Sequence, residues 1–376
     1  MHIDPAGLYI GIMSGTSLDG VDAVLAELPE PGAARLPQVP HLVHDDYPGA
    51  LRQRILAIAQ GQRITLDELG AVDQLVAAAY AQAVQRLLQE TGVDAAAVRG
   101  IGAHGQTVHH RPEGELRFTL QLGDPNLLAV RSGITVVADF RRRDMALGGQ
   151  GAPLAPGFHD MALRHPSRTR GVLNCGGIAN ISVLVPGQPC IGYDTGPANI
   201  LMDAWIEACR GERFDRGGAW AASGQLHAPL LRALLADRYF AQPAPKSTGR
   251  EHFNLAWLKR HLAALPGAAP AEADVMRTLL ELTAASITLA LQQHASAGEL
   301  LVCGGGAFNP ALMRRLAELN PGWAVASTAE HGIAPDAMEA LAFAVFAQRT
   351  LAGLPGNLPA VTGASRPCVL GGVYSA

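Results

Sequence analysis

The sequence contains very little lysine. Only Lys246 and Lys259 occur among its 29 basic residues, so arginine carries almost all of the positive charge. The net charge is −4 and charged residues make up 16% of the chain, a balance that gives no sign of a nucleic-acid or membrane-surface binder. No apolar segment approaches the ~20 residues that span a bilayer, and the N-terminus lacks the pattern of a signal peptide. We therefore expect a cytoplasmic protein that binds neither nucleic acid nor membrane.

Cysteine is also scarce. The chain has five cysteines and no C-x-x-C pair, and an odd number argues against a complete disulfide framework. Cys175 and Cys303 lie in apolar runs flanked by glycine, a setting that favours small buried thiols.

Several catalytic signatures are missing. The chain has no Gly-Lys pair for a Walker A motif, no G-x-S-x-G and no H-E-x-x-H, which disfavours a P-loop ATPase, an α/β-hydrolase and a zincin. The letters of G-x-G-x-x-G occur at residues 100–105. Those glycines begin inside a predicted strand and do not open a helix, so we reject a dinucleotide-binding fingerprint there.

Hydrophobic residues make up 48% of the 376 residues, enough for two domains. One pattern occurs twice, at residues 8–28 and 170–185: an apolar run, a turn rich in glycine and polar residues, and a second apolar run. Each reads as a β-hairpin, and the amides of such a tip can cradle phosphate oxygens while a carboxylate holds a metal ion. An ordinary hairpin with a polar turn, which binds no ligand, would have the same sequence pattern. Because strands and helices alternate after each hairpin, we expect two α/β lobes with a ligand cleft between them.

The remaining pattern predicts a series of elements and loops. Thr65 and Gly92 are typical start and stop signals for a helix over 66–89. We expect irregular chain at 29–48, a polar loop at 104–112, and a last helix that Asp336 caps. Other predicted helices cover 51–58, 200–209, 271–294 and 311–319, and other predicted strands cover 98–103, 117–122, 134–138, 191–193, 299–303, 323–327 and 367–374.

Two positions stand out at strand ends. Asp194 ends a predicted strand just before a helix, where catalytic groups gather but where an aspartate can also cap the helix. Gly304, Gly305 and Gly306 lie between a strand and a helix, where glycine allows the backbone to approach a ligand closely.

The polar clusters of the first half allow more than one interpretation. His104, His109 and His110 have no neighbouring set of Cys or carboxylates, so structural or substrate-binding roles are favoured over metal ligation. The run of arginines at 141–143 forms either a solvated face or part of an anion or sugar site.

Motifs across nearly the whole chain resemble, in order, those of the anhydro-N-acetylmuramic acid kinases, a family of the actin, hexokinase and heat-shock chaperone superfamily. They lie at residues 11–22, 104–107, 121–126, 139–141, 148–154, 174–180, 194–199, 303–306 and 338–343. The resemblance implies an α/β fold of two ribonuclease-H-like lobes, each a mixed sheet flanked by helices, around a nucleotide cleft. The expected lobes are 1–150 and 151–376, with the last helix and the tail, at about 352–376, packing on the first.

The resemblance also implies an activity. The enzyme would open the 1,6-anhydro ring of 1,6-anhydro-N-acetylmuramic acid hydrolytically and phosphorylate O6, which gives N-acetylmuramic acid 6-phosphate for cell-wall recycling. ATP and Mg²⁺ are the implied cofactors, the sugar is the implied partner, and a homodimer is the family expectation.

Site residues follow from the same match. Asp194 would be the catalytic base. Because residues 9–12 lack the early aspartate of many superfamily members, the metal would be held by Asp19, by Asp22 or by a residue of another lobe. The implied sugar contacts are His104, Gln106, Thr107, Arg141 and Glu339. The implied nucleotide contacts are Ser14, Gly15, Thr16, Ser17, Leu18, Asp19, Gly20, Val21, Asp22, Asn174, Gly176, Gly177, Gly304, Gly305, Gly306 and Asn309.

Two other functions compete with this one. A kinase of a different sugar would use the same lobes but would need no hydrolytic base. A chaperone-like, nucleotide-driven binding module should carry a long appendage after the second lobe, and this chain ends soon after its final helix.

Overall fold

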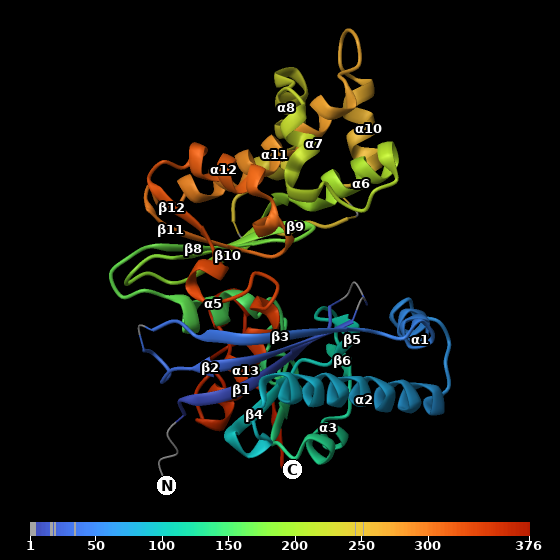
Figure 1. Ribbon diagram of the computed structural model, residues 1–376, viewed down its shortest axis with the longest axis vertical. Coiled ribbons are helices and arrows are strands. Elements are labelled where there is room, and N and C mark those ends of the chain that lie inside the picture. The colour runs from blue at the N-terminus through green and yellow to red at the C-terminus, as the bar shows by residue number, and fades with distance from the viewer. Residues whose placement is uncertain (1–4, 16–17, 19, 34, 245, 251) are drawn as a thin grey trace. The chain divides into compact units, whose positions relative to one another are not determined.

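The computed structural model describes residues 5–15, 18, 20–33, 35–244, 246–250 and 252–376. The chain divides into two compact units, the first made of Met1–Leu163 with His331–Ala376 and the second of Arg164–Glu330. Each unit contains a sheet with helices against it (Figure 1), which confirms the expected mixed α/β class.

The sheet of the first unit has six strands in the order β13-β7-β4-β1-β2-β3. The hairpin β1–β2 is antiparallel, whereas β1 runs parallel to β4 and β4 parallel to β7. The strands are β1 (Gly7–Met13), β2 (Gly20–Leu28), β3 (Gln38–Asp46), β4 (Val98–Ala103), β7 (Val136–Ala138) and β13 (Gly372–Tyr374). A separate two-stranded ribbon pairs β5 (Gln106–Arg111) with β6 (Phe118–Leu122).

The helices of the first unit are α1 (Gly49–Ala59), α2 (Leu66–Thr91), α3 (Pro125–Ser132), α4 (Arg142–Ala146), α5 (Ala155–Leu163), α13 (Met338–Leu351) and α14 (Pro359–Thr362). Helix α2 begins and ends as predicted: the Thr65 side chain accepts a hydrogen bond from Glu68 N at 3.1 Å, and Gly92 ends the helix with φ 66°. A side-chain cap at the start and a left-handed residue at the end supply partners for the terminal backbone groups.

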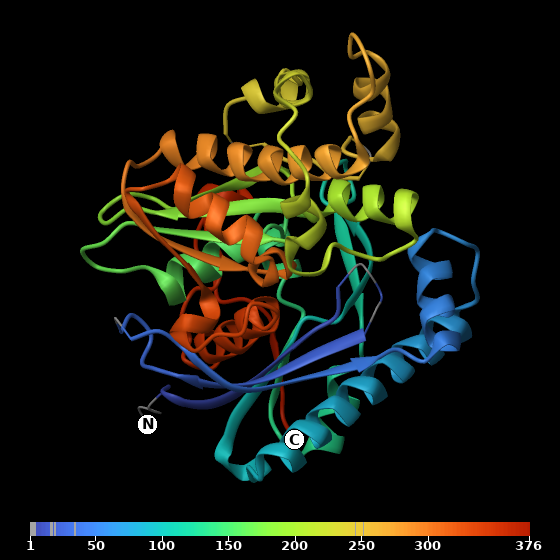
Figure 2. The ribbon, with the colours of Figure 1, turned by 45° about the horizontal axis from the view of Figure 1, so that its top comes forward.

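The two faces of this sheet meet different helices (Figures 1 and 2). Alternate side chains of β1 point to opposite faces, and Ile10 and Ile12 share a buried cluster with residues of α2. On the other face a Cβ at Gly11 would lie 1.9 Å from Ala340 O, and one at Gly102 would lie 1.9 Å from the Phe343 carbonyl oxygen. Helix α13 therefore rests directly on the backbones of β1 and β4.

That contact shifts the division of the chain from the expected one. The first unit extends to Leu163, beyond the expected boundary at residue 150, and residues 331–351, which include the last helix, belong to it together with the tail. The two glycines that seat α13 lie more than 200 positions earlier in the chain. Local patterns do not reveal such a pairing.

The second unit contains a five-stranded sheet in the order β10-β9-β8-β11-β12. Its strands are β8 (Arg170–Cys175), β9 (Ile178–Leu184), β10 (Ile191–Pro197), β11 (Gly298–Cys303) and β12 (Trp323–Ser327). Its helices are α6 (Asn199–Arg210), α7 (Ala219–Ser223), α8 (Ala228–Leu235), α9 (Arg238–Ala241), α10 (Leu255–Ala263), α11 (Glu272–Gln292) and α12 (Pro310–Leu319).

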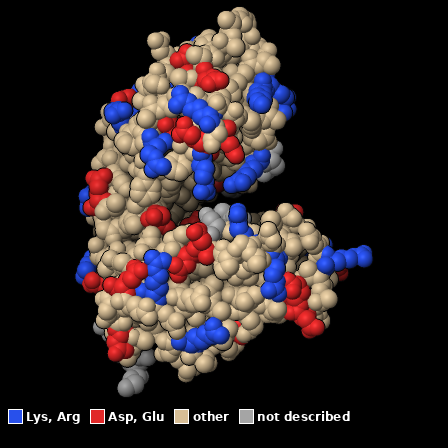
Figure 3. Space-filling model, turned by 45° about the vertical axis from the view of Figure 1, so that its right-hand side comes forward, with Lys and Arg blue, Asp and Glu red and all other residues tan. Residues whose placement is uncertain are grey.

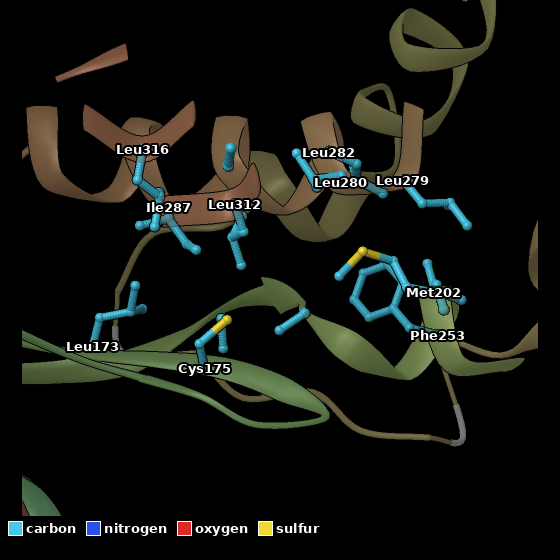
Figure 4. Packing of buried hydrophobic residues seen from close by; sticks show 14 of the residues in the cluster. Leu173, Cys175, Met202, Phe253, Leu279, Leu280, Leu282, Ile287, Leu312 and Leu316 are labelled. Atoms are coloured by element: carbon cyan, nitrogen blue, oxygen red, sulfur yellow. The ribbon is translucent and has the colours of Figure 1, made fainter. Parts of the chain in front are cut away.

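The core of the second unit lies between this sheet and the helices α11 and α12 (Figure 4). Leu173 and Cys175 of β8 point toward Ile287, Leu312 and Leu316, and all five are at most 1% exposed. Burying a leucine or isoleucine side chain is worth about 1.5–3 kcal/mol, so this contact holds the end of β8 firmly. Burial raises the pKa of Cys175 to about 12, which confirms an inert core thiol.

Three local predictions were wrong. The predicted polar loop at 104–112 contains β5, and the predicted irregular chain at 29–48 contains β3. Both strands are stabilised by partners, β6 and β2, whose pairing the local letters do not show. Asp336 does not cap the last helix, because α13 begins at Met338 and its N-cap position, Ala337, makes no side-chain cap.

The surface charges are mixed on the face drawn in Figure 3, where basic and acidic side chains are interspersed over each unit. None of the described helices is both long enough and apolar enough to cross a membrane.

Candidate active site

The first hairpin forms as predicted. Strands β1 and β2 pair from Gly7 opposite Leu28 to Met13 opposite Asp22. At the tip, Leu18 N donates to Gly15 O at 3.3 Å, and Leu18 adopts a φ of 55°, which is uncommon outside glycine. The predicted tip residues Thr16, Ser17 and Asp19 lie outside the described residues.

Two side chains from elsewhere in the first unit hold this tip. The buried Ser14 hydroxyl is hydrogen-bonded to the Tyr80 hydroxyl of α2 at 2.5 Å, and Gln106 Nε2 donates to Gly15 O at 3.1 Å. Burial raises the pKa of Tyr80 well above its usual value, so the phenol stays neutral. The Ser14 side chain is thus engaged in fixing the tip, which leaves its backbone as the candidate for a phosphate contact.

The strand that leaves the tip offers less to a ligand than predicted. Val21 is fully buried, and a Cβ at Gly20 would lie 2.3 Å from Asp45 O of the adjoining strand. Asp22 Oδ1 lies 2.7 Å from His44 Nδ1. Within the described part of the chain, no group of three or more His, Cys, Asp or Glu side chains is placed to hold a metal ion. The metal assignment of Asp19 and Asp22 stays a prediction.

His104, which is buried, and Arg141, which is partly buried, form a pair in the first unit. Arg141 Nε donates to His104 Nε2 at 2.9 Å, so the imidazole proton resides on Nδ1, where it makes no hydrogen bond of acceptable geometry with a described residue. Burial and the nearby guanidinium hold the pKa of His104 well below its usual value. The ring therefore stays neutral, and among the described residues its N–H donor has only the Gly105 backbone beside it.

Arg141 differs from the arginines that follow it. Its Nη1 donates to Gly151 O at 2.8 Å, whereas Arg142 and Arg143 are exposed. Burial lowers the pKa of Arg141 to about 10, and Glu339 in the first turn of α13 opposes that shift. The three arginines therefore differ: Arg141 is an inward-facing cation near Glu339, whereas Arg142 and Arg143 are exposed to solvent.

The other predicted sugar contacts lie close by in sequence but have different surroundings. Gln106 is fully buried, and its Oε1 has no hydrogen-bond partner among the described residues. Thr107 Oγ1 accepts from Gln121 Nε2 at 3.1 Å. His109 stacks on Phe118 with ring centroids 4.9 Å apart. His110 Nδ1 lies 3.2 Å from Thr119 Oγ1.

Asp144 was not singled out from the sequence, yet it organises the glycine loop beside Arg141. This fully buried carboxylate accepts from Gly151 N at 2.8 Å, Asn357 Nδ2 at 2.8 Å and Thr362 Oγ1 at 2.7 Å. A buried carboxylate is tolerated when hydrogen bonds surround it. Its position within a charged run does not indicate this role, because two of its three partners, Asn357 and Thr362, lie more than 200 positions later in the chain.

The second hairpin, in the second unit, is supported by backbone. Asn174 pairs with Asn180, and Cys175 pairs with Ala179. The carbonyls of Gly176 and Gly177 accept hydrogen bonds of 2.9–3.0 Å from the first backbone N–H groups of α6, those of Ala198, Asn199 and Ile200. These carbonyls take the place of a side-chain cap, which α6 lacks.

The three glycines after β11 divide into two kinds. A Cβ at Gly304, whose φ is 73°, would lie 2.5 Å from Asn174 Oδ1, and one at Gly306 would lie 2.3 Å from Cys175 Sγ. Both are therefore required by packing inside the unit. At Gly305 the nearest atom would be Asn199 Nδ2 at 3.4 Å, so Gly305 is the position with room for a ligand. Asn309 Oδ1 accepts from Ala311 N and Leu312 N, both at 3.1 Å, and caps α12.

Asp194 lies within β10 and does not cap α6. The N-cap position of that helix is Ala198, and Asp194 Oδ2 instead accepts from Thr248 N at 3.0 Å. Burial raises the pKa of this carboxyl, and the Thr248 N–H opposes the rise. No described residue donates to Oδ1. A partly buried carboxylate with one free oxygen has the properties of a general base.

Comparisons with known proteins give one matching family model and several similar solved structures. A family model described as anhydro-N-acetylmuramic acid kinase matches residues 7–376. Among solved structures, the chain is similar to an activator of 2-hydroxyisocaproyl-CoA dehydratase from Clostridium difficile, at 9% identity over 91% of this chain and 94% of that one, with a TM-score of 0.44. It is also similar to a ROK family glucokinase from Streptomyces griseus, at 13% identity over 85% and 91%, with a TM-score of 0.34. On the family match, the chain belongs to the anhydro-N-acetylmuramic acid kinase family.

Proposed function

We propose that this protein is an ATP-dependent kinase that opens the anhydro ring of 1,6-anhydro-N-acetylmuramic acid with water and phosphorylates O6. The product is N-acetylmuramic acid 6-phosphate, an intermediate of cell-wall recycling. Family membership over residues 7–376 supports the kinase class. The observation that carries the hydrolytic half is Asp194, a partly buried carboxylate whose pKa burial raises and whose Oδ1 accepts no hydrogen bond from a described residue.

In the proposed reaction, ionised Asp194 takes a proton from water as the water oxygen bonds to C1 of the sugar. The C1–O6 bond breaks, and its electron pair leaves with O6. O6 then bonds to the γ-phosphorus, the bond from that phosphorus to the bridging oxygen breaks, and ADP leaves. A raised pKa makes Asp194 a stronger proton acceptor once ionised, and general bases of this kind contribute about 10²–10⁴-fold.

We assign the nucleotide phosphates to the two hairpin tips and the adenosine side to Gly305. Backbone N–H groups aimed at phosphoryl oxygens stabilise the charge that develops during transfer. Mg²⁺ enters with the nucleotide. Because Asp22 is bonded to His44 and no metal-binding cluster occurs among the described residues, we derive no step that uses a metal ligand of this chain.

We assign the sugar to the pair His104 and Arg141. The Nδ1–H of His104 can donate to a sugar oxygen, and the cationic Arg141 can bind an anionic substituent. Glu339 would accept from a sugar hydroxyl. A homodimer and a cytoplasmic location stay predictions.

The decisive experiment is product analysis after incubation with ATP, Mg²⁺ and the anhydro sugar in ¹⁸O-water. We expect label at C1 and phosphate at O6. Turnover of a plain hexose with none of the anhydro sugar would refute the proposal.

Asp194→Asn tests the base directly. We expect kcat to fall about 10²–10⁴-fold while ATP affinity is retained. The matched control is Asp203→Asn on α6, another half-buried carboxylate, whose pKa burial raises to about 6. We expect this control to keep kcat, and an active Asp194→Asn variant would remove Asp194 from the mechanism.

A further inference from the structure

The strand that carries Asp194 has an open edge. β10 is the outermost strand of its sheet and pairs only with β9 in that sheet. Along an antiparallel strand, the N–H and C=O of one residue point to the same side. At Asp194 both find partners outside the sheet: Asp194 N donates to Lys246 O at 3.1 Å, and Asp194 O accepts from the Tyr239 hydroxyl at 2.6 Å.

The segment 246–248 thus takes the place of a neighbouring strand. Its first residue accepts from the Asp194 backbone, and its last residue, Thr248, donates its N–H to Asp194 Oδ2 at 3.0 Å. The backbone N–H and the carboxylate of Asp194 are therefore both bound by this segment, through Lys246 and Thr248. We call residues 246–248 the strap.

The strap is fixed by the side chain of Lys246. Its Nζ donates to Tyr239 O at 3.1 Å and to Phe240 O at 3.3 Å, and it lies 4.7 Å from the centroid of the Tyr239 ring. A lysine that bonds the last carbonyls of a helix, here α9, is a favourable C-terminal cap. The amine is therefore committed to the protein rather than free for a phosphate.

We propose that Lys246 is a positioning residue for Asp194. By capping α9 it holds the strap across the open edge of β10, so that the Thr248 N–H occupies Oδ2 and Oδ1 is left for the proton of the reacting water. This inference rests on the proposed function, in which Asp194 is the base.

The groups around the carboxylate allow its pH dependence to be predicted. The titratable side chains that contact β10 or the strap near Asp194 are Tyr193, Tyr239 and Lys246 among the described residues, and the Tyr193 hydroxyl lies 2.9 Å from His294 Nε2. Burial raises the pKa of both phenols, so at neutral pH they carry no charge. Loss of the Thr248 N–H bond removes a contact that favours the ionised form, so the pKa of Asp194 would rise further.

The test compares the two lysines of the chain. Lys246→Met removes the cap, Lys246→Arg retains a cation with hydrogen-bond donors, and Lys259→Met removes an exposed lysine as the matched control. For Lys246→Met we expect kcat to fall about tenfold or more, KM for ATP to stay within about twofold, and the acidic limb of kcat/KM to move to higher pH. Lys246→Arg should recover part of kcat, and Lys259→Met should match the wild type.

Hydrogen exchange at the Thr248 amide gives a readout that does not depend on turnover. We expect faster exchange in Lys246→Met than in Lys259→Met. If circular dichroism shows that Lys246→Met does not fold, Tyr239→Phe is used in its place. This variant lacks the hydrogen bond to Asp194 O and should produce the same shift of the acidic limb of kcat/KM. Equal exchange and an unchanged acidic limb in folded Lys246→Met would overturn the inference. Absence of turnover in the wild-type protein would instead refute the proposed function and leave the exchange test intact.

Discussion

The two glycine-rich hairpins share one local design but are supported in different ways. The tip of the first is held by side chains from distant elements, Tyr80 on Ser14 and Gln106 on Gly15. The turn of the second is held by backbone, with its carbonyls on the first N–H groups of α6. A similar sequence pattern therefore does not imply similar tolerance to substitution. The first hairpin is loosened by removing one polar atom, whereas the second is disturbed mainly by adding volume.

The largest effect should follow from added volume beside the second hairpin. Gly306→Ala places a Cβ 2.3 Å from Cys175 Sγ, whereas Gly305→Ala meets nothing closer than 3.4 Å. We expect Gly306→Ala to lower the free energy of unfolding by about 1–3 kcal/mol and Gly305→Ala to change it little. Thermal unfolding measures both. Gly305→Ala should instead weaken ATP binding, and unchanged ATP affinity would remove Gly305 from the adenosine side.

An intermediate effect should follow from loosening the first hairpin. Tyr80→Phe leaves the buried Ser14 hydroxyl without its partner, which should cost about 1–2 kcal/mol of unfolding free energy. We expect Ser14→Ala to cost a similar amount and the double variant to cost less than the sum, because one hydrogen bond is shared. Urea denaturation of the four proteins measures this coupling. Strict additivity would show that the two hydroxyls do not support each other.

The smallest effect concerns a pair beside the tip of the first hairpin, where His44 of β3 faces Asp22 of β2. Burial lowers the pKa of His44, but its hydrogen bonds to Asp22 and Asp46 outweigh this and raise it above 6.5. A raised pKa contributes stability that is present below the ordinary value and is lost as pH rises through the folded-state value. The free energy of unfolding of the wild type should exceed that of His44→Gln by about 0.2–1 kcal/mol at pH 5.5 and should equal it at pH 8.5. The difference is small because the pair is half-exposed. An equal difference at both pH values would contradict this.

The sequence was most informative where one segment determines its own structure. The α2 helix, both hairpins and the glycine turn after β11 carry their signals within a few residues, and each formed where it was predicted. The sequence leaves Asp194 as either a base or a cap. The fold excludes the cap, because Ala198 is the N-cap position of α6 and the Asp194 carboxylate accepts from Thr248 N, 54 positions away; the role of base stays a prediction.

Distant partners account for what the sequence could not show. The division of the chain depends on Gly11 and Gly102 meeting the backbone of α13. The support of the first tip depends on Tyr80 of α2, which lies 66 positions after Ser14. Two of the three hydrogen bonds that the Asp144 carboxylate accepts come from residues 357 and 362. In each case one partner is a residue of a type that occurs in many ordinary structural positions. No local sequence pattern therefore identifies it as a partner.

The late position of α13 in the chain has a consequence for biosynthesis. The second unit is continuous, so all of its residues have been made by the time Glu330 is added. The first unit is started earlier but cannot be completed until residues 338–351 follow. Because domains generally fold as units while the ribosome extends the chain, the part made first should be the part that matures last. Until then the face of β1 and β4 that α13 covers stays exposed in the nascent protein. This face should be the part of the nascent protein most prone to aggregation.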